Sequence, residues 1–148
     1  MSDTWSGGCQ CGAVRYRFTK KPDGAHVCHC RMCQKAFGAF YAPLVGARHE
    51  YFGVTRGEIA KYSSSDLVER GFCRDCGTPL TFAYDTPEAR IYVTIGSMDD
   101  PELAGIEIQY GLEARISWVR FCEDVPGEIT GDSPVAQEFF AGMKSNQG

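Results

Sequence analysis

Seven of the eight cysteines fall into three short clusters, and this arrangement constrains the fold more than any other feature of the chain. The clusters are Cys9-Gln10-Cys11, Cys28-His29-Cys30-Arg31-Met32-Cys33 and Cys73-Arg74-Asp75-Cys76. Thiolates at such spacings can share one zinc ion, which takes four ligands at ~2.3 Å from sulfur. Gly12 and Gly77 directly follow two of the clusters, and glycine accepts the positive φ of a tight chelating turn. The sequence therefore predicts a zinc-binding protein.

The rest of the composition indicates one globular domain in a reducing compartment. The chain has 148 residues, enough for a single core. Residues 1–5 lack the basic and apolar regions of a signal peptide, and no run approaches the ~18 apolar residues of a membrane span. We therefore expect a cytoplasmic protein with no membrane partner, in which cysteines bind metal rather than form disulfides. The net charge of −4 argues against a nucleic-acid partner.

Alternating apolar and polar residues predict a mainly β, antiparallel domain with short helical pieces. Strands are expected at residues 13–18, 39–45, 80–84, 90–95 and 116–121, where aromatic and β-branched residues gather. Short helices are expected at residues 31–37 and 135–141, the second packing Phe139 or Phe140 on the body. We expect residues 1–131 to form the zinc-binding domain and residues 132–148 to form a peripheral C-terminal tail.

The number of cysteines favours a division into four and three. Four of them, Cys9, Cys11, Cys73 and Cys76, can form one closed site of four thiolates, the pattern of a structural zinc. The other three, Cys28, Cys30 and Cys33, lie within six residues and leave one position of a second zinc open, the pattern of a catalytic metal. Two zinc ions per chain are therefore expected.

Several alternatives stay open at this stage. The first four cysteines can instead be a disulfide pair or idle thiols, and the pairs can be grouped into sites differently. The second zinc can also be structural, with its fourth ligand from His26, His29, His49 or Cys122. Cys122 directly follows the alternating segment at 116–121, which favours a buried structural thiol. Three thiolates on one zinc carry a net negative charge that Arg31 or Lys35 can balance, although both are more simply solvated helix residues.

Taken in this order, the cysteine clusters resemble the glutathione-dependent formaldehyde-activating enzyme family, which also includes centromere protein V. The resemblance runs from about Gly7 to Pro126. It is carried by residues 8–12, 27–38, 71–80, 93–101 and 110–115, then by Trp118 and residues 124–126. Together the three cysteine motifs are specific, whereas any one alone is weak. Two departures are visible: Gln109 stands where many relatives have His before the Tyr-Gly pair, and the chain leaves little room for an added glutathione-binding subregion.

The resemblance implies a β-tent fold of antiparallel sheets with a structural four-cysteine zinc and a second, three-cysteine zinc. It also implies carbon–sulfur lyase chemistry, in which glutathione and formaldehyde form S-hydroxymethylglutathione. On this reading Cys28, Cys30 and Cys33 hold the reactive metal, a small thiol such as glutathione is the partner, and His29 or Tyr41 can carry a proton, with packing the simpler role for Tyr41.

Two other functions fit the same residues. A non-catalytic zinc module that binds another protein is suggested by the departures and by the lack of a clear acid–base pair. A zinc store or redox sensor is suggested by a labile three-thiolate cluster. The three readings differ in whether the second cysteine group opens onto a pocket.

Overall fold

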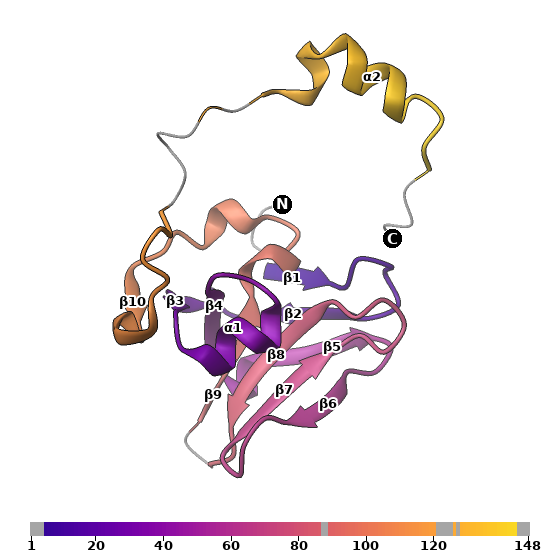
Figure 1. The fold of residues 1–148 in the computed structure, drawn as a ribbon. Coiled ribbons are helices and arrows are strands. Elements are labelled where there is room, and N and C mark those ends of the chain that lie inside the picture. The colour runs from indigo at the N-terminus through magenta and orange to yellow at the C-terminus, as the bar shows by residue number, and fades with distance from the viewer. Residues whose placement is uncertain (1–4, 87–88, 121–125, 127, 145–148) are drawn as a thin grey trace.

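The computed structural model describes residues 5–86, 89–120, 126 and 128–144, and its described strands form two sheets (Figure 1). The smaller sheet has the order β1–β2–β5 and is antiparallel throughout. Its strands are β1 (Trp5–Gly8), β2 (Arg15–Phe18) and β5 (Phe52–Arg56). In β2 the side chains of Tyr16 and Phe18 are buried while those of Arg15 and Arg17 are more exposed, as the alternating pattern predicts.

The larger sheet has the order β10–β3–β4–β9–β8–β7–β6. Its strands are β3 (Asp23–Cys28), β4 (Ala42–Arg48), β6 (Ala60–Ser63), β7 (Val68–Phe72), β8 (Pro79–Tyr84), β9 (Arg90–Thr94) and β10 (Ile108–Tyr110). All neighbours are antiparallel except β10, which pairs with β3 in parallel. The mainly β prediction is confirmed, with this one parallel pair as an addition.

The main core combines buried side chains from both sheets. Tyr16 and Phe18 of β2 pack in the same cluster as Val45 of β4, Leu80 of β8 and Val93 of β9. Burying side chains of this size contributes about 1.5–3 kcal/mol each. Cys9 and Cys73 belong to the same buried cluster, so the core extends up to two of the cysteine-bearing turns.

The helix predicted at residues 31–37 is present with those bounds, as α1 (Arg31–Phe37). Cys30 is its N-cap, and the Cys30 sulfur accepts from the backbone N–H of Cys33. The helix ends at Gly38 with φ of 59°, a left-handed C-cap that favours glycine. Its buried Cys33 joins a second cluster with Ala42, Leu44 and Phe82, which holds α1 against the larger sheet.

Five short 3₁₀ turns are described: three lie between strands, and the last two follow β10. They are η1 (His49–Tyr51), η2 (Ile95–Ser97), η3 (Pro101–Leu103), η4 (Leu112–Ala114) and η5 (Thr130–Asp132). None of the helices in the described part of the chain is long and apolar enough to cross a membrane.

The strand predicted at residues 116–121 is wrong for residues 116–120. Here the chain turns, with the N–H of Val119 donating to the carbonyl of Ile116 at 3.0 Å. Val119 is buried and Trp118 is 64% exposed. The alternation in sequence therefore reflects a turn that buries one side chain and exposes its neighbour. Residues 121 and 122 lie outside the described residues, and the predicted role of Cys122 with them.

The helix predicted at residues 135–141 is present as α2 (Pro134–Phe140), but the predicted burial of Phe139 or Phe140 is wrong. Both rings are exposed and lie edge to face on each other, with centroids 5.0 Å apart. The main contacts of α2 are with η5, its neighbour in sequence, and Figure 1 shows α2 apart from both sheets. The division of the chain at residues 131 and 132 stays a prediction.

Candidate metal centres

The turns of two β-hairpins bring the first four cysteines together. Cys9 and Cys11 lie between β1 and β2, and Cys73 and Cys76 lie between β7 and β8. Their four sulfur atoms all lie within 4.8 Å of one another. Because β1 and β2 belong to the smaller sheet and β7 and β8 to the larger, this four-cysteine group joins the two sheets.

The spacing of these sulfurs fits a tetrahedral zinc. Four ligands at ~2.3 Å from a central ion lie about 3.8 Å from each other. The Cys9 and Cys11 sulfurs are 3.6 Å apart, and those of Cys11 and Cys73 are 3.8 Å apart. All four are free thiols, so the disulfide alternative is not what the structure shows. The donor set and the spacing are those of a closed thiolate site.

Nearby donors stabilise negative charge on this group. The backbone N–H of Val14 donates to the Cys9 sulfur at 3.2 Å. The Thr78 hydroxyl lies 3.2 Å from the Cys76 sulfur, and this hydrogen bond lowers the pKa of Cys76 to about 6. By contrast, the pKa of Cys11 is raised to about 12, because the backbone hydrogen bond from Ala13 that lowers it is outweighed by Cys9 and the other thiols. Four thiols this close cannot all ionise without a cation among them.

A single segment of the chain forms the second group, which lacks a fourth cysteine. Cys28 is the last residue of β3, Cys30 caps α1 and Cys33 lies within the helix. Their three sulfurs lie within 4.8 Å of one another, and the Cys33 N–H donates to the Cys30 sulfur at 3.3 Å. Among the residues that the structure describes, no histidine or carboxylate completes the group at that distance. The donor set fits a divalent ion held by three thiolates.

None of the three histidines suggested as a fourth ligand joins the three-cysteine group in the described part of the chain. The His26 Nδ1 lies 2.9 Å from the carbonyl oxygen of Gly24. The His29 Nε2 lies 2.8 Å from the Gln109 Oε1; since an amide oxygen only accepts, Nε2 carries the proton. The His29 ring also packs against Tyr41, with centroids 5.5 Å apart, so the two proposed proton carriers contact each other.

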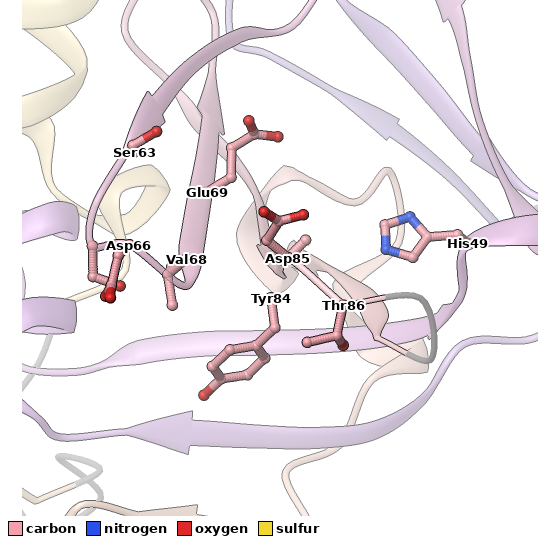
Figure 2. A pocket seen from close by; sticks show the side chains of 10 residues that line it. His49, Ser63, Asp66, Val68, Glu69, Tyr84, Asp85 and Thr86 are labelled. Atoms are coloured by element: carbon pink, nitrogen blue, oxygen red, sulfur yellow. The ribbon is translucent and has the colours of Figure 1, made fainter.

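His49 lies in a separate, acidic pocket. This pocket has a volume of about 370 Å³, and Figure 2 shows its wall with Asp66, Glu69 and Asp85. No cysteine lines it. The pocket therefore has no part in either cysteine group.

A cavity of about 600 Å³ opens onto the three-cysteine group. Cys28 and Cys33 form part of its wall. Much of the remaining wall is aromatic, contributed by His26, Phe82, Tyr84, Tyr92 and Tyr110. The one arginine of the wall, Arg90, is paired with Asp23. A small molecule in this cavity would reach two of the three sulfurs.

Burial controls the charge of the second group in a metal-free state. It raises the pKa of Cys28 to about 12. Burial also raises the pKa of Cys33, although a hydrogen bond from Arg70 opposes the rise. The pKa of Cys30 is lowered, since the effect of its burial is outweighed by hydrogen bonds such as the one from the Cys33 backbone. A bound cation would be needed to ionise all three thiols at neutral pH.

Sequence reasoning missed Arg70, which donates from Nη2 to the Cys33 sulfur at 3.5 Å. Arg31 and Lys35, the cations suggested instead, are exposed, and Arg31 donates to Gln34. A signal for Arg70 was available: Val68 and Phe72 flank it at a spacing of two, which places Arg70 on the more apolar face of its strand.

Two residues of the closing segment support the second group from outside. The N–H of His29 donates to the carbonyl of Tyr110 at 2.9 Å. Gly111 has φ of 69°, and a Cβ added there would lie 3.0 Å from the Cys30 backbone nitrogen. Both the conformation and the close approach therefore favour glycine beside Cys30.

Comparison with known proteins agrees with this geometry. The family described as glutathione-dependent formaldehyde-activating enzyme matches residues 4–111, a span that contains both cysteine groups and Gly111. The chain belongs to this family. The match confirms the resemblance found in the sequence.

Two individual relatives extend the comparison. An uncharacterized lyase of Schizosaccharomyces pombe is 31% identical over 87 residues, which cover 54% of this chain and 58% of that protein. A crystal structure of a Rhodobacter sphaeroides protein is 26% identical with a TM-score of 0.56, covering 71% of this chain and 98% of the other. Family membership and the lyase relative support an enzyme.

Proposed function

We propose that the protein is a zinc-dependent carbon–sulfur lyase that acts on the adduct of a small thiol and an aldehyde. In this proposal Cys9, Cys11, Cys73 and Cys76 hold a structural zinc, and Cys28, Cys30 and Cys33 hold a second one. The observation that carries the proposal is the cavity of about 600 Å³ that opens onto Cys28 and Cys33. A closed structural site has no need of such access.

The proposed reaction balances without a further reactant. The thiol sulfur forms a bond to the carbonyl carbon of formaldehyde, the electron pair of the carbonyl bond moves to oxygen, and the thiol proton ends on that oxygen. The product is S-hydroxymethylglutathione when the thiol is glutathione. A bound zinc would supply Lewis acidity that favours the thiolate form of the thiol.

The chain's own residues would position the reactants. Cys28 and Cys33 place the metal-binding group at the wall of the cavity, and the rings of Phe82 and Tyr92 exclude water from the adjoining surface. Holding two small reactants side by side turns a bimolecular step into an effectively unimolecular one, which lowers the barrier.

The test measures exchange between free glutathione with formaldehyde and S-hydroxymethylglutathione by two-dimensional NMR exchange spectroscopy. We expect the unmodified chain to accelerate this exchange and Cys30→Ser to remove the acceleration. Met32→Leu is the matched control, because Met32 lies in the same segment, is exposed and binds no metal in this proposal. If the chain accelerates exchange with another small thiol but not with glutathione, the lyase function is supported with a different thiol substrate.

A second measurement separates the enzyme from a zinc module or zinc store. Cobalt in place of zinc gives visible absorption that reports the ligands of the ion. We expect added glutathione to change the spectrum of the three-cysteine group and to leave that of the four-cysteine group unchanged. The proposal fails if small thiols neither change the spectrum nor displace the second metal.

A further inference from the structure

We infer that Arg70 is the counter-charge of the three-cysteine group and a positioning residue for its metal-bound state. The inference rests on the proposed function, because it assumes that the group binds a divalent cation. It concerns a residue of β7, distant in sequence from the segment that carries the three cysteines.

Arg70 is buried where an arginine rarely is. Its side chain is 7% exposed, in the middle of a strand. The Nε donates to the Ser64 hydroxyl at 3.0 Å and Nη2 donates to the Cys33 sulfur at 3.5 Å, while the buried Nη1 has no partner. The guanidinium also lies over the Phe82 ring, 4.9 Å from its centroid. These contacts fix the cation beside a sulfur atom.

No carboxylate explains this buried charge. Among the described residues, none of the ion pairs within 4.0 Å includes Arg70. The neighbouring Glu69 pairs with Lys61 on the exposed side of the sheet. Because a buried guanidinium stays protonated and needs a compensating negative charge, the Cys33 sulfur is the group that must supply it.

The charges balance when all three thiols are ionised and a divalent cation is bound. Three thiolates with one divalent cation carry one net negative charge, and the guanidinium cancels it. Three neutral thiols would leave the guanidinium unbalanced. The position of Arg70 therefore favours the metal-bound thiolate state over the protonated, metal-free state.

Arg70 acts through Cys33 rather than on a substrate. It is not part of the cavity wall, whereas two of the residues it contacts, Cys33 and Phe82, both are. We therefore expect Arg70 to control how strongly the group holds its metal, with little effect on which molecules enter the cavity.

The test counts zinc ions per chain by native mass spectrometry at increasing chelator concentration. We expect Arg70→Gln to weaken zinc binding at the three-cysteine group about 10–100-fold, the usual effect of losing a partner of a metal ligand. Arg70→Lys, which keeps the charge, should restore most of the affinity. The control is Arg56→Gln, because Arg56 is exposed and donates to the Gly12 carbonyl beside the other group. Zinc in the four-cysteine group reports that each variant is folded.

A measurement on the unmodified chain keeps the test independent of variant folding. The NMR signal of the Arg70 Nε–H should shift when the three-cysteine group is stripped of zinc, while that of Arg56 should stay. An unchanged Arg70 signal, or equal zinc binding by Arg70→Gln and the unmodified chain, overturns the inference alone. A single zinc in the unmodified chain overturns the inference and the proposed function together. If zinc binding at the three-cysteine group depends on Arg70 but the chain does not accelerate thiol exchange, the inference is supported and the proposed lyase function is contradicted.

Discussion

The two cysteine groups use similar motifs in different ways. The four-cysteine group draws two ligands from each of two hairpin turns and joins the two sheets. The three-cysteine group draws on one short segment at the start of α1 and opens onto a cavity. Closure across distant turns suits stability, whereas a local group with an open side suits chemistry.

The two groups also differ in what stabilises their charge. Near the first group the donors are a backbone N–H and the Thr78 hydroxyl, and Cys76 is exposed to solvent. Near the second group the backbone N–H of Cys33 donates to the Cys30 sulfur, and the buried guanidinium of Arg70 donates to the Cys33 sulfur. At the second group, a buried cation beside Cys33 compensates the net negative charge that three thiolates keep around a divalent ion.

The largest expected contrast is between losing a ligand in each group. Cys73→Ser should prevent cooperative folding, since structural zinc contributes about 10–16 kcal/mol in small zinc domains, as much as the whole stability of a typical domain. Cys33→Ser should leave the fold in place and remove thiol exchange. Thermal unfolding with zinc counting would check both. Equal loss of folding in the two variants would contradict the division into a structural and a reactive group.

Metal removal should separate the groups in time. We expect a chelator to take zinc from the three-cysteine group first, because that ion has three protein ligands and faces a cavity. Thiol exchange should therefore disappear after loss of the first zinc, and the circular dichroism signal of the sheets only after loss of the second. Simultaneous loss of both signals would argue against this order.

A smaller effect is expected from Gly111→Ala. The positive φ costs a non-glycine residue roughly 1–2 kcal/mol, and the added Cβ would press on the Cys30 backbone. We expect a lower free energy of unfolding and weaker zinc binding at the three-cysteine group only. Gly105→Ala is the control, because a Cβ there meets nothing within 4 Å. Weaker binding at the four-cysteine group would show that the strain is not local.

The smallest effect is expected at Asp99, which anchors the loop beside the four-cysteine group. The Arg15 guanidinium donates to it and, with Ser6, lowers its pKa below the usual 3.8. A lowered carboxyl pKa adds stability above pH 3.8 that is lost as the pH falls through the lowered value. Asp99→Asn should therefore reduce the melting temperature slightly, by the same amount from pH 8 to pH 5. If the difference in melting temperature between Asp99→Asn and the unmodified chain changes between pH 8 and pH 5, another titrating group is responsible.

Local patterns predicted much of this protein. The bounds of α1, four of the ten described strands (β2, β4, β8 and β9) and the two sets of cysteines follow from alternation, spacing and glycine placement, because these signals report the neighbours of each residue along the chain. Predictions from these patterns were wrong where the structure depends on contacts with a distant segment of the chain. Residues 116–120 alternate like a strand but form a turn, and Phe139 is exposed on a helix that lies apart from both sheets.

The sequence by itself determined which residues can bind metal, since thiols at these spacings can chelate in almost any fold. Only the tertiary structure decided what lies beside them. The fold places Cys73 beside Cys11, 62 residues away in sequence, and pairs β10 with β3 in parallel. It also places the Arg70 guanidinium within hydrogen-bond distance of the Cys33 sulfur. Burial and counter-charge depend on contacts between segments far apart in the chain, and no local pattern records those contacts.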